Sequence, residues 1–278
     1  MTGTISPLLV LGATGAIGTR LVARAAAAGR RTIAVARDAA ALAALRERHG
    51  ATVLPLAATL CSDADAAALA DRVAALAGPR PGAVVAAIRG AAPARRLLDA
   101  PADFLRRRLD EDLLPHLAAA RHLLPLLAPV PGGAYVLVGG PGAEQPWSGY
   151  GHRSIGAAAL QMLARVLHEE ARTLPVRVQM LAIDSPVRTA HNAAHACTQW
   201  PDADAIADYA LRMVDGRLRP DAALLRFPSE GPVRPPGLSD DIDLAAAPCL
   251  PASTHDTAAQ ALLQRIAARS RSPQEFRS

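Results

Sequence analysis

Residues 7–18 read PLLVLGATGAIG, and this stretch decides the fold. A short apolar run that ends in glycine is typical of a buried strand, and residues 18–29, GTRLVARAAAAG, then have the apolar spacing of a helix. Gly12, Gly15 and Gly18 therefore lie between a strand and a helix, where the backbone turns tightly and the helix N-terminus attracts phosphate. The pattern predicts a dinucleotide-binding loop, and a tight turn without a ligand is the alternative.

The rest of the chain repeats this alternation. We expect strands at residues 31–37, 51–58, 82–90, 133–140, 176–183 and 222–227, and helices at 38–50, 62–78, 103–128, 154–173 and 202–216. Ser62 is the expected N-cap of its helix, and Pro115 is expected to kink the helix at 103–128 or divide it into a pair. Strands joined through helices predict an α/β fold with a doubly wound, Rossmann-like parallel sheet.

The expected sheet accounts for residues 1–228, which we interpret as a single domain. Residues 229–256 are rich in proline, aspartate and serine without periodicity, which is typical of a linker or a loosely packed tail. Residues 257–270 have amphipathic helical spacing. We therefore expect residues 229–278 to form a C-terminal extension that ends in a helix.

The composition narrows the class of protein. About half of the 278 residues are hydrophobic, which permits a sizeable core. No uncharged apolar run approaches the ~20 residues of a membrane span, and the N-terminus lacks the pattern of a secretion signal, so we expect a cytoplasmic protein without a membrane partner. All 30 basic residues are arginines, spread along the chain among 25 acids, so we expect a small-molecule substrate and no nucleic acid. Without lysine, no lysine amine serves in catalysis.

Arg37 ends the second expected strand and is followed by Asp38. Nucleotide sites that select NAD usually place an acid at this point for the ribose hydroxyls, whereas an arginine pairs with a 2′-phosphate. The sequence therefore favours NADP(H) as the cofactor, and a solvated loop arginine is the alternative.

From about residue 8 to residue 227, the sequence resembles the short-chain dehydrogenase/reductase family. The likeness rests on the glycine loop, the strand order, RRRLDEDLLPHLAAARHLLPLL at 106–127, GGAYVLVGG at 132–140 and SPVRT at 185–189. The resemblance implies a nicotinamide cofactor and a homodimer or homotetramer built on two long helices. The positions that it implies for the cofactor are Gly12, Thr14, Gly15, Ile17, Gly18, Arg37, Thr59, Ala87, Gly90, Val187 and Thr189.

The family's chemistry uses a tyrosine, a lysine four residues later, a serine and an asparagine. Anchoring the alignment on Tyr150 makes the lysine position Ser154. Anchoring it on the following helix makes the tyrosine position Arg153, the lysine position Ala157 and the serine position Gly140, and we prefer this choice because it also keeps the fifth strand in register. The asparagine position resembles Asp112 in either case. The resemblance thus implies a divergent member that lacks the Tyr-x-x-x-Lys pair.

Four side chains remain as catalytic candidates. Tyr150 is a candidate proton donor, although a tyrosine near pKa 10 needs a nearby cation, for which Arg153 is the candidate. His152 is a candidate general acid with a pKa suited to neutral pH, or an exposed loop histidine. Asp112 is a candidate base, or it caps or pairs within its charged helix. No metal is expected, because the histidines and cysteine at 191–197 lack a further ligand.

These features favour an NADP(H)-dependent oxidoreductase with a non-standard site that reduces a carbonyl or conjugated small molecule. Two alternatives stay open. One is an inactive member that serves as a nucleotide sensor or scaffold, and the other is a non-redox enzyme, a cyclase or dehydratase, on the same fold.

Overall fold

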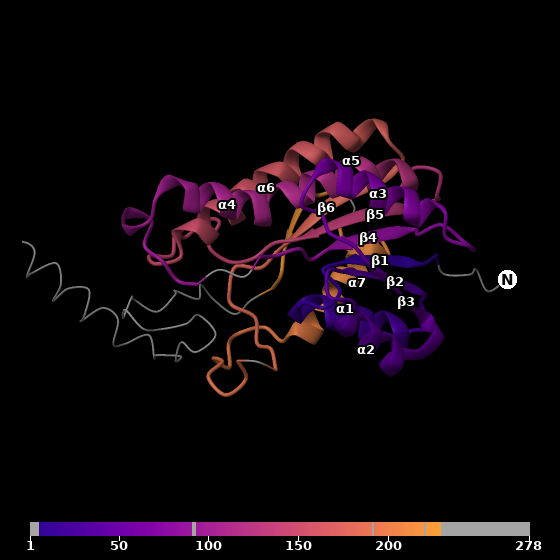
Figure 1. The fold of residues 1–278 in the computed structure, drawn as a ribbon, viewed down its shortest axis with the longest axis horizontal. Coiled ribbons are helices and arrows are strands. Elements are labelled where there is room, and N and C mark those ends of the chain that lie inside the picture. Colours follow the sequence, from indigo (N-terminus) through magenta and orange to yellow (C-terminus); the bar gives the residue numbers. More distant parts are fainter. Residues whose placement is uncertain (1–5, 91–92, 191, 220, 229–278) are drawn as a thin grey trace, which may run out of the picture.

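The computed structural model describes residues 6–90, 93–190, 192–219 and 221–228, and these form one parallel sheet flanked by helices (Figure 1). The described strands follow the order β3-β2-β1-β4-β5-β6-β7, and each pairs in parallel with its neighbours. The expected doubly wound fold is therefore confirmed. The strands are β1 (Leu8–Leu11), β2 (Thr32–Ala36), β3 (Val53–Ala57), β4 (Ala83–Ala86), β5 (Gly133–Val138), β6 (Val176–Ala182) and β7 (Leu224–Arg226).

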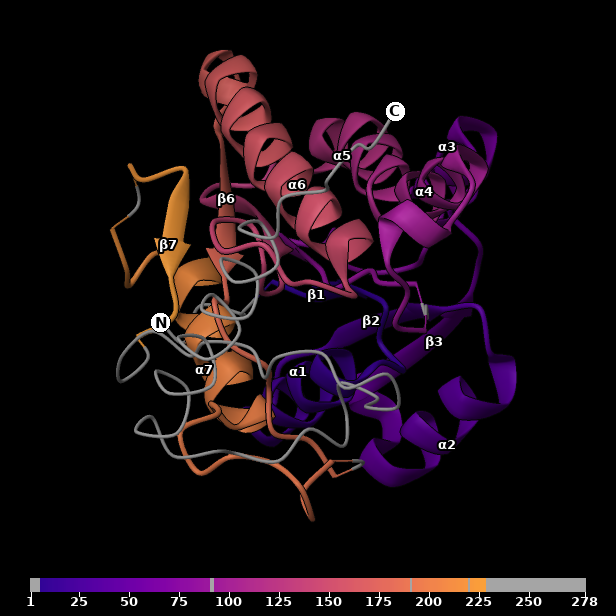
Figure 2. The same cartoon turned by 90° about the vertical axis from the view of Figure 1, so that its left-hand side faces the viewer.

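The helices cover both faces of the sheet, because each parallel crossover must pass over one of them. Figures 1 and 2 show α1 (Ala16–Ala27), α2 (Ala39–His49) and α7 (Ala203–Val214) on one face. The opposite face carries α3 (Asp63–Ala74), α4 (Ala102–Asp112), α5 (Leu114–Leu127) and α6 (Gly151–Glu170). Each face thus gains its own aliphatic core.

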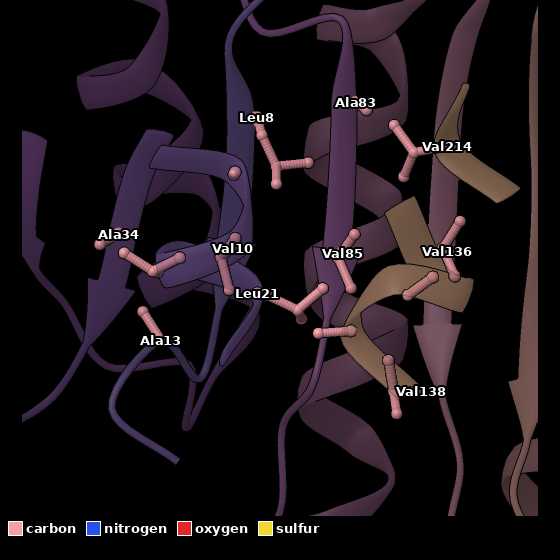
Figure 3. Packing of buried hydrophobic residues seen from close by; sticks show 14 of the residues in the cluster. Leu8, Val10, Ala13, Leu21, Ala34, Ala83, Val85, Val136, Val138 and Val214 are labelled. Atoms are coloured by element: carbon pink, nitrogen blue, oxygen red, sulfur yellow. The ribbon is translucent and has the colours of Figure 1, made fainter. Parts of the chain in front are cut away.

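Alternate residues along each strand supply the two cores. Val10, Val85 and Val136 come from neighbouring strands and point to the same face, where Leu21 of α1 packs against them (Figure 3). Their sequence neighbours point the other way; Tyr135, for example, packs within the second core. This double burial explains why the strands are apolar throughout rather than alternating.

The helix boundaries follow local signals. Ser62 forms the expected N-cap of α3, and its hydroxyl accepts from the N–H of Asp65 at 3.1 Å within a full capping box. The segment expected at 103–128 is a broken pair, since α4 ends at Asp112 and Pro115 lies in the first turn of α5. Helix α6 begins at Gly151, three residues before the expected start, which places Tyr150 at its N-cap.

The last described strand, β7, ends at Arg226, and the expected extension at 229–278 lies outside the described residues. Within the part that the structure describes, no helix is both long and apolar enough to cross a membrane.

Candidate active site at the carboxyl ends of the strands

The three loop glycines have separate structural roles. Gly12 has φ +75°, and a Cβ there would lie 2.3 Å from the carbonyl oxygen of Ala87. A Cβ on Gly18 would lie 2.0 Å from the carbonyl oxygen of Gly12, so this glycine lets α1 pack onto the loop. A Cβ on Gly15 would meet only the Gly12 oxygen, at 3.3 Å. The first and third glycines are therefore needed by the fold, and the second leaves open space at the start of α1.

The loop lies where the sheet changes its winding direction. Strands β1 and β4 are neighbours, and the chain leaves β1 toward one face and β4 toward the other (Figure 2). In open parallel sheets, ligands bind in the crevice outside the carboxyl ends of such strands. The loop residues predicted from the sequence therefore occupy the expected place for a ligand.

A cleft of about 320 Å³ joins the loop to the segment after β6. Thr14 and Gly15 line one wall, and Thr189 lines the other. Asn192 fixes the second wall, because its amide oxygen accepts from the N–H of Thr189 at 2.7 Å and its amide nitrogen donates to Val187 at 3.0 Å. The structure thus brings together cofactor positions that are more than 170 residues apart in the sequence.

Two expected positions lie farther along the same edge. Arg37 is exposed directly after β2, while the side chain of Asp38 is used to cap α2 and accepts from the N–H of Ala41 at 3.0 Å. Thr59 is exposed just after β3. Both residues therefore lie at the carboxyl ends of β2 and β3, on the same side of the sheet as the glycine loop.

Hydrogen bonds with β1, α4 and α5 hold the turn that follows β4. Ala87 donates to the carbonyl of Leu11 at 3.0 Å, which continues the β1–β4 pairing. Asp112 accepts from the N–H of Gly90, and the Nε2 atom of His116 lies 3.1 Å from the carbonyl oxygen of Ile88. Asp112 therefore contacts the turn after β4, a partner outside its own helix that the sequence did not indicate. His116 was missed because a single histidine in an apolar helix gives no sequence signal.

Tyr150 and Arg153 meet at the start of α6. The Tyr150 ring is buried, and the Arg153 guanidinium carbon lies 5.6 Å from its centroid, a cation–π contact. Trp147 packs edge-on against the same ring at 6.5 Å between centroids. The expected proximity of the tyrosine and its candidate cation is therefore present.

His152 differs from its expectation. It is 1% exposed and packs edge-on against Phe104 at 5.2 Å, and neither ring nitrogen has a hydrogen-bond partner among the described residues. Burial, together with the smaller effects of the charges on Arg153, Arg108 and Arg89, lowers its pKa to about 4. The expectation of a pKa suited to neutral pH is therefore wrong. The alternative of an exposed loop histidine is wrong too, because α6 begins at Gly151 and buries the ring.

The two anchors of the alignment can be compared with the geometry. The hydroxyl of Ser154 accepts from the N–H of Trp147 at 3.0 Å and packs against Gly142, so this residue holds the loop that leads into α6. Gly140 and Arg153, in contrast, both lie near Arg89. Ser154 therefore has a structural partner in the loop, whereas Arg153 and Gly140 lie on the side of Arg89.

Arg89 is the residue that sequence reasoning missed. It lies in the turn after β4, and a Cβ on Gly140 would be 3.6 Å from its Nη1 atom. Its side chain is accessible, yet desolvation by the surrounding protein and the charge of Arg153, opposed by the charge of Asp112, together lower its pKa to about 10. The stretch AIRG at 87–90 carried the signal, because a charged residue directly after a buried strand seldom lacks a role.

The fold and the loop define the class of this protein, a nucleotide-binding α/β protein with a dinucleotide-type glycine turn. The profile of the short chain dehydrogenase family matches residues 7–198, which is more than half of the chain. The chain therefore belongs to the short-chain dehydrogenase/reductase family of oxidoreductases.

Solved structures agree with this assignment. The chain is similar to an oxidoreductase of the short-chain dehydrogenase/reductase family from Burkholderia thailandensis, with 28% identity and a TM-score of 0.70 over 80% of this chain and 91% of the other. A short-chain type dehydrogenase/reductase from Mycobacterium ulcerans shares the fold at 18% identity, with a TM-score of 0.71 over 81% and 89%. So does the closed form of a serine dehydrogenase complexed with NADP+, at 15% identity, with a TM-score of 0.70 over 85% and 100%. No curated protein matches the chain.

Proposed function

We propose that this protein is an NADP(H)-dependent oxidoreductase that reduces a carbonyl or conjugated small molecule in a divergent active site. The observation that carries the proposal is the cleft between Gly15 and Thr189, where an open helix N-terminus faces an ordered loop. A bound nicotinamide cofactor supplies hydride, and the residues of the chain bind and orient it. The proposed place for the small molecule is between the Gly140 turn and the start of α6.

The preference for NADP(H) rests on Arg37. This side chain is exposed beyond β2, and its neighbour Asp38 is engaged at the α2 cap rather than facing the ribose. A guanidinium pairs with a 2′-phosphate through charge-assisted hydrogen bonds. The NADP+ complex of the serine dehydrogenase, which shares the fold, is consistent with this preference.

Tyr150 is the proposed proton donor. Its ring lies at the N-cap of α6 with the guanidinium of Arg153 over one face. Asp112 fixes the turn that carries Arg89, so we assign it a positioning role. Because its pKa is lowered to about 4, His152 is uncharged at neutral pH, and we do not assign it the role of general acid.

The experiment pairs a binding titration with an activity screen. NADPH is titrated into the full chain by calorimetry, and NADPH oxidation is then followed at neutral pH against a panel of ketones, aldehydes and enones. Binding together with turnover of at least one substrate supports the proposal. Absence of NADPH binding overturns it.

A second candidate is a catalytically inactive sensor or scaffold, and the replacements at Gly140, Arg153 and Ala157 favour it. Changing Arg153→Tyr together with Ala157→Lys restores the family's pair. Carbonyl reduction by that double variant, in a protein that had none, identifies the natural chain as a sensor or scaffold. Conversion of a substrate without NADPH oxidation would instead identify the non-redox alternative, a cyclase or dehydratase.

We also propose a homodimer or homotetramer that uses helices α5 and α6. Ile155, Met162 and Val166 lie along one face of α6 and are 40%, 56% and 43% exposed, and Leu114 and Leu117 of α5 are similarly exposed. Such apolar faces are typical of an interface. Light scattering at micromolar concentration checks this proposal, and a monomer contradicts it. The cytoplasm remains the proposed location, to be checked by fractionation.

A further inference from the structure

Arg89 lies directly after β4, and no acidic side chain among the described residues contacts its guanidinium. Arg89 forms no hydrogen bond or ion pair with the described residues, whereas Arg24, Arg30, Arg108 and Arg226 each contact a carboxylate. Asp112 acts on Arg89 only through its charge, because its Oδ1 atom accepts from the N–H of Gly90. The guanidinium therefore has free donors in a solvent-accessible position.

The surroundings of Arg89 raise the positive potential further. The charge of Arg153 acts on Arg89, and the charges of Arg89, Arg108 and Arg153 all act on the buried ring of His152. Arg95 also lies nearby in the same part of the structure, 5.6 Å from the centroid of Phe104. Like charges that lie close together repel one another, so an anion that binds at Arg89 is stabilised by the charge of Arg153 as well.

The position of Arg89 favours contact with the substrate over contact with the phosphates of the cofactor. Arg89 extends from β4 to Gly140 at the end of β5, on the side of the sheet that leads to α6. The phosphate-binding loop lies at β1, and Arg37 lies beyond β2. Gly140 has no side chain, which leaves room for the guanidinium where a serine would otherwise stand.

We propose that Arg89 binds an oxyanion, a carboxylate or phosphate, on the substrate, so that the protein acts on an anionic carbonyl or conjugated compound. This inference rests on the proposed function. A guanidinium presents a planar pair of N–H donors that matches both kinds of oxyanion, and the pairing is stronger when the cation is partly desolvated before the anion arrives. The charge of Arg153 adds to the positive potential at Arg89.

Matched probes and variants test the inference on the full chain. Benzoylformate is compared with benzoylformamide, and dihydroxyacetone phosphate with dihydroxyacetone, by calorimetry with and without saturating NADP+. In the unmodified protein at least one anion is expected to bind roughly ten- to a hundredfold more tightly than its neutral partner. The carboxylate and phosphate arms identify which oxyanion is preferred.

The variants are Arg89→Gln, Arg89→Lys and Arg80→Gln. Arg80 is exposed and lies before the amino end of β4, at the opposite end of the strand from Arg89, so it serves as the control. Loss of the preference for the anion in Arg89→Gln, partial retention in Arg89→Lys and full retention in Arg80→Gln support the inference, with circular dichroism confirming the fold of each variant.

Equal binding of anion and neutral partner, no binding of any anion, or an unchanged preference in Arg89→Gln overturns the inference. A loss of NADPH affinity in Arg89→Gln with an unchanged anion preference overturns it too, since Arg89 then serves the cofactor. The parallel NADPH titration of the unmodified chain separates these results from a failure of the proposed function, which is a failure to bind NADPH whatever the anions do.

Discussion

The backbones of Gly12 and Ala87 approach so closely that a Cβ on Gly12 would lie 2.3 Å from the Ala87 carbonyl oxygen. This contact joins the end of β1 to the end of β4, the two strands between which the sheet changes winding direction. A side chain at position 12 would therefore separate the phosphate loop from the turn that carries Arg89. The cofactor cradle and the candidate substrate site depend on the same glycine.

Gly15 and Gly18 should respond differently to a side chain. In Gly15→Val the new Cβ meets only the Gly12 oxygen, at 3.3 Å, so we expect the fold to be kept with a small adjustment and NADPH binding to be lost. In Gly18→Ala the Cβ would lie 2.0 Å from the Gly12 oxygen, which should destabilise the fold by about 1–3 kcal/mol or more. Thermal unfolding and NADPH calorimetry on both variants check this. Normal nucleotide binding by folded Gly15→Val would mean that the loop is only a turn.

Arg37 should set the choice between the two nicotinamide cofactors. A charge-assisted contact with the 2′-phosphate contributes about 1.5–3 kcal/mol, which is roughly ten- to a hundredfold in affinity. We expect Arg37→Ala to lose that factor for NADPH and to leave NADH affinity unchanged. Calorimetry with both nucleotides measures the two constants. Equal affinity of the unmodified protein for NADPH and NADH contradicts the assignment.

The fold could be predicted from the sequence because its signals are local. The apolar runs, the glycine loop and the Ser62 cap each report on a few neighbouring residues, and parallel crossovers leave little freedom for the rest. The site depended on contacts across the sheet. Nothing near Arg89 indicates that its guanidinium meets Gly140, and nothing near His152 indicates that Phe104 and three arginine charges surround it.

Ser154 should matter for stability rather than for catalysis. Its hydroxyl accepts from the buried N–H of Trp147, and Ser154→Ala would leave that donor without a partner. We expect a loss of about 1–3 kcal/mol in the free energy of unfolding, measured by urea titration. Ser148→Ala, on an exposed residue of the same loop, is the control and should change stability by less than about 0.5 kcal/mol. A catalytic defect in Ser154→Ala at full stability would revive the first alignment.

Tyr150→Phe removes the proposed proton donor and keeps the packing of the ring against Trp147. Proton-transfer groups contribute ~10²–10⁴-fold in rate, so turnover should fall by that factor while NADPH affinity is unchanged. Tyr209→Phe, on α7 at the other face of the sheet, is the control and should keep full activity. An unchanged rate in Tyr150→Phe would exclude this residue and leave water as the proton source.

His152 and His116 should make the protein sensitive to acid. Burial, aided at His152 by three arginine charges, lowers the pKa of each ring to about 4, from an unfolded value near 6.5. Between these values the unfolded chain binds protons that the folded chain does not, so stability is full above about pH 6.5 and falls as the pH drops toward 4. Each ring contributes at most about 1.4 kcal/mol per pH unit over that window.

The variant His152→Leu isolates one of the two contributions. Urea titrations of the variant and the unmodified protein are compared at pH 7.5, where both rings are neutral, and then at steps down to pH 4.5. The variant should gain stability relative to the unmodified protein as the pH falls, by up to about 1.4 kcal/mol per unit. If the two stability curves stay parallel, His152 takes up a proton in the folded protein as readily as in the unfolded chain. The three surrounding arginine charges would then have to be screened from the ring.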